Sequence, residues 1–122
     1  MASKSKATKA LLKARFRVVH GDNIALGPGK VELLALVAET GSLNEAARRL
    51  DMSYMRAWTL VKTMNACFHE PVVIAERGGK QGGGMKITET GRCALTLYQD
   101  MEAAALASTA SSWRKLQKLL RR

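Results

Sequence analysis

The polar and basic side chains of residues 53–63 have the types and spacing that could do chemistry. Arg56, Thr59, Lys62 and Thr63 recur at helical spacing, so we expect them to share the outward face of one helix. A guanidinium can bind a guanine base at two points, a hydroxyl can bond a base edge, and an ammonium group binds phosphate. This combination favours recognition of a nucleic acid, with Arg56 as the best candidate for reading a base.

A helix-turn-helix over residues 42–68 is predicted to position that face. Ser42 is a suitable N-cap, and Glu45 three residues later completes a capping box. Asp51 tolerates the left-handed backbone that a sharp turn needs, and Ser53 caps the second helix. The buried stripes are predicted to be Leu43, Ala46, Ala47 and Leu50 in the first helix and Tyr54, Ala57, Val61, Met64 and Phe68 in the second. A short helix that turns into a longer helix with a basic outer face is the layout of a DNA-reading motif.

Neighbouring residues of this motif have two interpretations each. Arg48 and Arg49 face water from the first helix and either bind phosphate or are ordinary solvated charges. The Tyr54 ring can be buried while its hydroxyl reaches a phosphate. Trp58 either packs against the protein or stacks on a sugar or base, and packing is the commoner role.

A glycine-rich loop over residues 77–84 separates two short β-branched runs. The runs VVIAE and MKIT read as strands, and the loop with its flanking strands is predicted to be a wing. Arg77, Lys80 and Lys86 would then reach phosphates or an adjacent minor groove. A nucleotide-binding loop is disfavoured because Gln81 follows Gly79 and Lys80, where that motif requires Ser or Thr. A flexible linker is the other alternative.

The sequence offers no catalytic or metal-binding constellation. His20 and His69 lack a partner Asp, Ser or Cys at a useful spacing, and the acidic residues are scattered. Cys67 and Cys93 lie among apolar neighbours, which predicts reduced packing residues and a cytoplasmic protein. We therefore expect no enzyme, no metal and no cofactor.

The charge balance favours a polyanionic partner. Twenty Lys and Arg against ten Asp and Glu give 122 residues a net charge of +10. Binding to a nucleic acid releases counterions from each neutralised phosphate, so nucleic acid is the first choice and an anionic membrane surface the second. The chain has no apolar run long enough to cross a membrane, and residues 1–16 lack the pattern of a secretory signal.

The rest of the chain divides into three regions. Residues 1–13 are predicted to be a flexible basic tail that either lies on a phosphate backbone or has no partner. Residues 14–88 form the winged helix-turn-helix domain: a hairpin turns at residues 21–23, and a helix then begins near Pro28 and ends at Gly41. The buried face of that helix is predicted to be Val31, Leu34, Leu36, Val37 and Ala38.

Residues 89–122 are predicted to form a terminal helical region for dimerisation. Thr88 can cap a helix to about residue 106, which has an apolar stripe of Ala94, Leu97, Tyr98, Met101 and Ala105, and residues 108–112 interrupt it. A three-helix core with a wing has no surface for two more apolar stripes, so we expect a homodimer in this region. The expected dimer contacts are Leu97, Met101, Leu106, Trp113, Leu116 and Leu120. The alternative is that the helix folds back onto its own domain.

Two stretches resemble known families of regulators. The stretch VAETGSLNEAARRLDMS is similar to the helix-turn-helix of LysR-type regulators. The stretches SYMRAWTLVKTMN and VVIAERGGKQGGGMKITETG resemble the N-terminal domain of ModE-type, molybdate-responsive transcriptional regulators, over roughly residues 27–98. The resemblance implies a mainly α winged helix with a small β wing and terminal dimerisation helices. It also implies DNA contacts from Ser53, Tyr54, Arg56, Thr59, Lys62, Arg77, Lys80 and Lys86.

The resemblance does not extend to molybdate binding. Full-length ModE-type regulators carry C-terminal oxyanion-binding modules that sense molybdate, and the present sequence has no residues left for such a β-rich module. We therefore do not expect molybdate to bind this chain, although the glycine-rich wing could bind an anion weakly. Molybdenum metabolism or metal transport as the regulated pathway is implied only by the resemblance.

Two functions remain. The first is a sequence-specific, dimeric transcriptional regulator, such as a repressor, that binds double-stranded DNA. The second is an architectural protein that coats DNA or RNA without choosing a sequence. The hydrogen-bonding outer face of residues 53–63 favours the first, because coating needs only positive charge.

Overall fold

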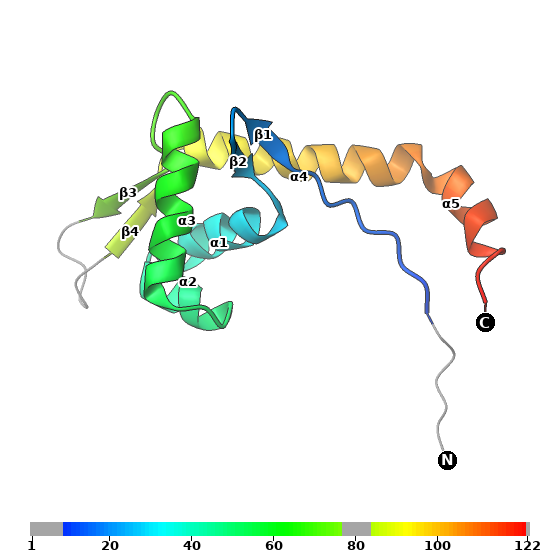
Figure 1. Cartoon of the computed structure of the whole chain (residues 1–122), viewed down its shortest axis with the longest axis horizontal. Coiled ribbons are helices and arrows are strands. Elements are labelled where there is room, and N and C mark those ends of the chain that lie inside the picture. The colour runs from blue at the N-terminus through cyan, green and yellow to red at the C-terminus, as the bar shows by residue number, and fades with distance from the viewer. Residues whose placement is uncertain (1–8, 77–83, 122) are drawn as a thin grey trace, which may run out of the picture.

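The computed structural model describes residues 9–76 and 84–121 as a mainly α-helical domain with two small β-hairpins. Figure 1 shows a cluster of helices and a long helix that runs out from it. In chain order the elements are β1 (Val18–His20), β2 (Asn23–Leu26), α1 (Pro28–Thr40), α2 (Leu43–Arg49), α3 (Tyr54–Cys67), β3 (Val73–Glu76), β4 (Gly84–Ile87), α4 (Glu89–Ser108) and α5 (Ala110–Gln117). The predicted winged helix-turn-helix with its small β wing is confirmed.

The N-terminal hairpin turns where the sequence predicted. Gly21 has a φ of +61°, which glycine adopts at no steric cost, and His20 pairs with Asn23 across the turn. Strand β2 then packs beside α3 and ends in buried Leu26.

Helix α1 has the predicted start and stop. Pro28 occupies the first turn, and Gly41, with a φ of +68°, donates its N–H to the Val37 carbonyl at 2.8 Å. Val31, Leu34 and Val37 are buried, whereas Leu36 and Ala38 are only half-buried. The sequence reading omitted Leu33, which is fully buried because α2, α3 and the wing surround α1 on more than one side.

Helices α1, α2 and α3 form the predicted three-helix core. Asp51 between α2 and α3 has a φ of +57°, as expected for a sharp turn without glycine. The predicted stripes are buried at Leu43, Ala46, Ala47, Ala57, Val61 and Met64, and half-buried at Leu50 and Phe68. The prediction that Tyr54 belongs to the stripe is wrong: its side chain is 42% exposed, because the first turn of α3 projects beyond the core.

The wing is an antiparallel pair, β3 and β4, in which Val73 faces Ile87 and Ile74 faces Lys86. Val73, Met85 and Ile87 are buried, while Ile74 and Lys86 are exposed, so the alternation of a half-buried sheet is present. The N–H of Met85 donates to the Gly41 carbonyl at 3.0 Å and fixes the wing to the α1–α2 connection.

Asn65 joins α3 to the wing, a role that the sequence reading missed. Its Oδ1 accepts from the N–H groups of Val72 (2.8 Å) and Val73 (3.3 Å), and its Nδ2 donates to the Val73 carbonyl at 3.0 Å. The side chain therefore satisfies the backbone at the start of β3 and holds the strand at a fixed height along α3.

The first half of α4 packs on its own domain. Thr88 Oγ1 accepts from Gly91 N–H at 2.9 Å, which confirms the predicted cap. Tyr98 is buried to 1% exposure, and its hydroxyl donates to the Phe16 carbonyl at 2.7 Å. The alternative that the helix folds back onto its own domain therefore holds for this half.

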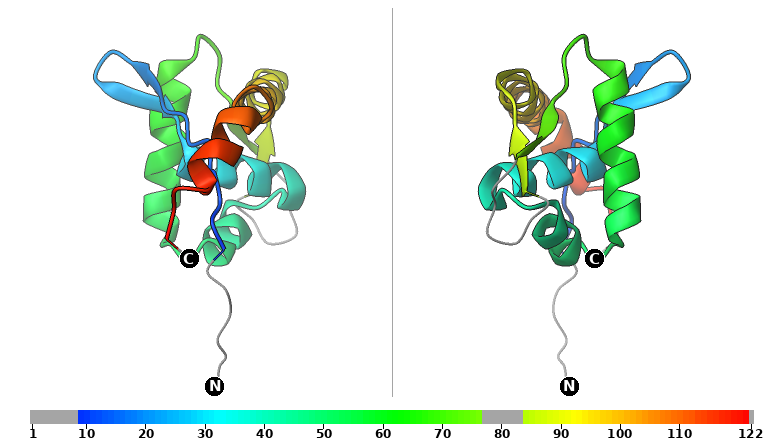
Figure 2. Two further views of the ribbon diagram at one scale, coloured as in Figure 1. Left: turned by 90° about the vertical axis from the view of Figure 1, so that its right-hand side faces the viewer. Right: turned by 90° about the vertical axis from the view of Figure 1, so that its left-hand side faces the viewer.

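The second half of α4 and all of α5 leave the core. Figures 1 and 2 show α4 extending past the domain and α5 bending away from its end. The break between the helices comes at Thr109, inside the predicted weak point, and α5 has no buried residue.

Candidate nucleic-acid interface

The outer face of α3 carries the predicted recognition residues. Arg56, Thr59 and Lys62 are exposed and Thr63 is half-buried. They lie away from the buried stripe of Ala57, Val61 and Met64, which holds the helix on the core. The buried stripe thus determines which side chains a ligand can meet.

The two threonines have little hydrogen-bond donor capacity left. Thr59 Oγ1 donates to the Met55 carbonyl at 2.9 Å, and Thr63 Oγ1 donates to the Thr59 carbonyl at 3.0 Å. Each hydroxyl keeps its acceptor lone pairs. In this arrangement the two hydroxyls are suited to accept a hydrogen bond from the amino group of adenine N6 or cytosine N4. Arg56 and Lys62 are suited to donate hydrogen bonds instead.

The sequence reading missed Met55 on this face. Its side chain is 67% exposed and lies four residues before Thr59, so the two share one side of α3. A methionine left in water is suited to apolar contact with a thymine methyl group or a sugar. The signal was available, because Met55, Thr59 and Lys62 recur at helical spacing.

Ser53, Tyr54 and Trp58 have different positions. Ser53 Oγ accepts from Arg56 N–H at 3.0 Å and so caps α3, as predicted. Exposed Tyr54 leaves its hydroxyl free to reach a phosphate. Trp58 is half-buried against the core, which agrees with the packing interpretation.

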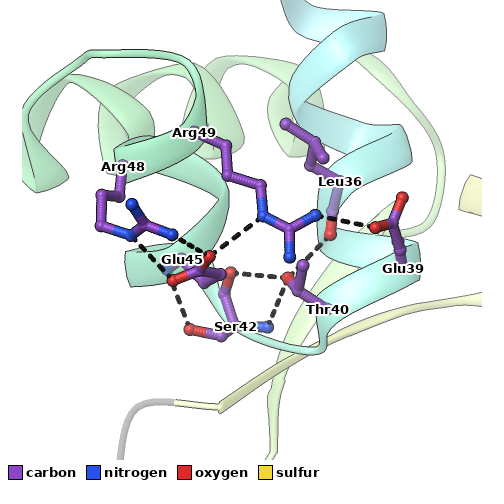
Figure 3. Close-up of polar contacts among 7 residues, drawn as sticks. All are labelled: Leu36, Glu39, Thr40, Ser42, Glu45, Arg48 and Arg49. Atoms are coloured by element: carbon purple, nitrogen blue, oxygen red, sulfur yellow. Dashed lines mark hydrogen bonds and ion pairs between the residues drawn. The ribbon is translucent and has the colours of Figure 1, made fainter.

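Arg48 and Arg49 are exposed but paired with acids (Figure 3). Arg48 Nε and Nη2 donate to the two Glu45 carboxylate oxygens at 3.0 and 2.5 Å. Arg49 Nε donates to Glu45 Oε2 at 3.0 Å, and its Nη1 donates to Glu39 Oε2 in α1 at 2.8 Å. Hydrogen bonds from Arg48 and then Arg49 hold the pKa of Glu45 at about 2. The acids offset much of the positive charge that these arginines would offer to a phosphate.

Glu45 does not complete the capping box. Ser42 Oγ accepts from Glu45 N–H at 3.0 Å, so half of the predicted box is present. The return bond is replaced: Ser42 N–H donates to Thr40 Oγ1 at 3.2 Å, as Figure 3 shows. Two guanidinium groups compete for the carboxylate and provide charge-assisted bonds, which are stronger than a bond from one neutral amide.

The wing contributes one described cation. Lys86 is exposed on β4, on the outward side of the hairpin. Arg77 and Lys80 lie outside the described residues, so their expected contacts remain predictions. The expected mobility of residues 1–8 also lies outside this range, while Lys9 and Lys13 are exposed.

The predicted dimer residues do not form one surface. Leu97 and Met101 are exposed by 56% and 45% on one flank of α4. Leu106 is nine residues beyond Leu97, about two and a half turns, so it projects from the opposite flank. There it lines a groove with Leu12 and other residues of the same domain. Trp113 is half-buried, Leu116 is exposed on α5, and Leu120 is exposed just after α5.

Other chemistry is weakly supported. Both cysteines are free, and Cys67 is half-buried. Cys93 is exposed beside a groove lined by Phe68, His69 and Leu97. The prediction that Cys93 is a packing residue is therefore wrong. Helix geometry turns Cys93 toward the flank of Leu97 rather than toward the core. Within residues 9–76 and 84–121, no three metal-binding side chains cluster, and no helix has the length and apolarity to cross a membrane.

Comparison with known proteins gives a family match and several relatives. Residues 29–92, more than half of the chain, match the family described as "Bacterial regulatory helix-turn-helix protein, lysR family". The chain is 38% identical over 78 residues to "Molybdenum transport protein ModE" of Azotobacter vinelandii, covering 64% of this chain and 29% of that protein. It is 39% identical over 102 residues to "Molybdenum-pterin-binding protein MopB" of Rhodobacter capsulatus, covering 84% and 37%.

A third relative carries a name that refers to DNA. The "DNA-binding transcriptional dual regulator ModE" of Escherichia coli (strain K12) is 34% identical over 71 residues, covering 58% of this chain and 27% of that protein. The chain thus spans about a third of the length of these curated relatives. The matched segment includes α1, α2, α3, the wing and the start of α4.

Proposed function

The chain belongs to the lysR family of bacterial regulatory helix-turn-helix proteins, and we propose that it is a sequence-specific transcriptional regulator that binds double-stranded DNA through α3 and the wing. Binding to chromosomal DNA would place it in the cytoplasm. The relatives' names describe regulators and molybdenum-related proteins rather than enzymes acting on DNA.

The outer face of α3 is the observation that carries this proposal. Arg56 donates, while Thr59 and Thr63 can mainly accept, and Met55 offers an apolar contact. Such a mixture discriminates among base edges in a major groove, whereas uniform coating of phosphates requires cations alone. Lys62 and Lys86 would hold the helix in register through phosphates.

A DNA-selection experiment tests the proposal. Purified protein at near-physiological salt should enrich one sequence from a random pool. Arg56→Ala should then weaken binding to that sequence by about 1–3 kcal/mol and relax preference at one position. The matched control is Lys62→Ala, which should weaken all duplexes similarly and reduce the salt slope by about 1. Failure to enrich any sequence would indicate an architectural coating protein instead.

We propose a homodimer formed through the exposed apolar flank of α4 and through α5. Leu97 and Met101 are one turn apart on α4, Leu116 lies on α5 and Leu120 lies just after it, and all four are exposed in the single chain. Dimers of helix-turn-helix proteins bind half-sites about 34 Å apart, so the selected sequence should be a palindrome.

Solution mass tests the dimer separately from DNA binding. Sedimentation should give twice 13.3 kDa for the wild type and 13.3 kDa for Leu97→Asp/Met101→Asp. Leu106→Asp is the control, because Leu106 projects from the opposite flank and lines a groove of its own domain. A wild-type monomer at all concentrations would contradict the proposed interface.

The names of the relatives suggest the regulated genes. We propose that the target sites precede genes for molybdenum uptake or use, because three relatives are named for molybdenum. Recovery of chromosomal fragments bound by the protein in its own host would test this, and enrichment of unrelated promoters would contradict it.

A further inference from the structure

Helix α5 separates apolar and basic side chains onto different faces. Trp113 and Leu116 are three residues apart and share one side of the helix, and Leu120 lies beyond its end. Arg114 and the C-cap residue Lys118 are four residues apart on another side, where they line a shallow groove with Gln117 and Leu120. The proposed dimer contact uses the apolar side and gives the cations no role.

The cations of this region are uncompensated by acids. Residues 103–122 contain five Lys and Arg and no Asp or Glu, so they hold half of the chain's net charge of +10. Arg114, Lys115 and Lys118 are exposed, and none takes part in an ion pair within the described part of the chain. By contrast, Arg48 and Arg49 beside α3 are paired with Glu45.

Helix α5 places these cations on the side of the molecule where the α2–α3 turn lies. Figure 1 shows α5 bending from the end of α4 toward the side on which the α2–α3 turn lies, and both views of Figure 2 agree. Helix α4 has 20 residues, which corresponds to about 30 Å. This length is close to the roughly 34 Å of one turn of duplex DNA.

We infer that the basic face of α5 is a second DNA contact, which binds phosphates flanking the recognition site by about one helical turn. This inference rests on the proposed DNA-binding function. The basic face offers cations but no mixture of donors and acceptors that could distinguish base edges. It therefore binds phosphates, and the contact adds affinity and footprint length but no base preference.

A membrane surface is the less suitable partner. A basic amphipathic helix can lie on anionic lipid, but α5 has only eight residues, and its apolar side is short. The placement on the side of the α2–α3 turn favours DNA, because one duplex can then meet both surfaces.

A charge-matched pair of variants tests the inference. Arg114→Gln/Lys118→Gln removes two cations from α5, and Arg17→Gln/Arg92→Gln removes two from the segment before β1 and the first turns of α4, away from the α2–α3 turn. Both substitutions are at exposed positions, so circular dichroism and sedimentation should show unchanged fold and mass. The probes are the selected duplex and the same duplex with ten base pairs of mixed sequence at each end.

The inference predicts that the wild type binds the extended duplex more tightly and protects its flanks from hydroxyl radicals. The α5 variant should lose flank protection and the length effect, and the slope of log affinity against log salt should fall by about 2 per protomer. Between 50 and 200 mM salt this corresponds to a loss of affinity that is smaller by about ten-fold for one protomer and about a hundred-fold for the proposed dimer. The control variant should keep the length effect.

Three results would overturn the inference. The first is that the α5 variant protects the flanks as the wild type does. The second is that the control variant loses flank protection and the length effect equally. The third is that the wild type binds phosphatidylserine vesicles through α5 while the DNA footprint of the α5 variant is unchanged. If the wild type selects no DNA sequence, the proposed function fails first. If it does and the α5 variant behaves like wild type, only the role of α5 is refuted.

Discussion

The close approach of α4 to Val72, just before β3, and to Ile87 in β4 makes Gly91→Ala a sharp test of how α4 is held. A Cβ at Gly91 would lie 2.1 Å from the Val72 carbonyl oxygen and 2.8 Å from Ile87 Cγ1. The carbonyl cannot move freely, because it accepts from Thr88 N–H at 3.0 Å while Val72 N–H donates to Asn65 at 2.8 Å. The helix must therefore shift away from the strand.

Two effects of opposite sign determine the magnitude. Alanine is favoured over glycine inside a helix by about 1 kcal/mol. Forcing extra volume into a packed site costs about 1–3 kcal/mol or more, and contact with backbone at 2.1 Å is at the upper end. We expect a net loss of about 2 kcal/mol in the free energy of unfolding, or roughly 8 °C in Tm at about 4 °C per kcal/mol.

Thermal unfolding followed by circular dichroism at one fixed protein concentration measures this loss. The control is Gly29→Ala in the first turn of α1, where an added Cβ has no atom within 4 Å. That variant should equal or exceed the wild type in stability. If Gly91→Ala also unfolds at or above the wild-type Tm, the close packing of α4 on Val72 and Ile87 is refuted.

Three further predictions concern side chains that hold the domain together. Asn65→Ala should cost about 1–3 kcal/mol in urea unfolding, because two N–H groups and one carbonyl of β3 lose their partner, and an unchanged midpoint would contradict this. Tyr98→Phe keeps the ring but should lose about 0.5–1.5 kcal/mol and expose the segment around Phe16 to proteases. Burial first, and the charge of Glu102 second, raise the pKa of Tyr98, so its phenolate absorbance should develop at higher pH than in the unfolded chain. The lowered pKa of Glu45 contributes stability that is complete above pH 4.5 and is lost as pH falls toward 2. Glu45→Gln should remove that part of the acid dependence, and an identical acid profile would exclude it.

Local signals made most of the fold predictable. Pro28, Gly41, Ser42, Ser53 and Thr88 mark helix ends by their own backbone and side-chain chemistry, and the structure has helix ends at each of them. Gly21 and Asp51 likewise adopt the positive φ that their residue types tolerate.

The choice of a side chain between competing partners was not predictable from residue spacing alone. Glu45 was expected to return to Ser42, but its partners Arg48 and Arg49 lie on the next turn and attract the carboxylate more strongly. Asn65 looked like an ordinary helical residue, since its partners Val72 and Val73 are set by tertiary packing.

The candidate site was predicted in outline only. The order of Arg56, Thr59 and Lys62 along one face followed from helical periodicity, but exposed Met55 was overlooked because methionine in a helix is usually buried. Whether α4 packs on its own domain depends on Gly91 and Tyr98, whose contacts with Val72 and Phe16 join residues far apart in sequence.

The unequal attachment of α4 makes it a lever arm. Its last fixed point is buried Tyr98, and its free end at Ser108 is 10 residues away, about 15 Å along the axis. A tilt of about 5° at Tyr98 would move that end by about 1 Å. In a dimer joined through the free part of α4, such a displacement would change the separation of the two α3 helices. A small movement of the wing that tilts α4 would then change how well the dimer fits two half-sites.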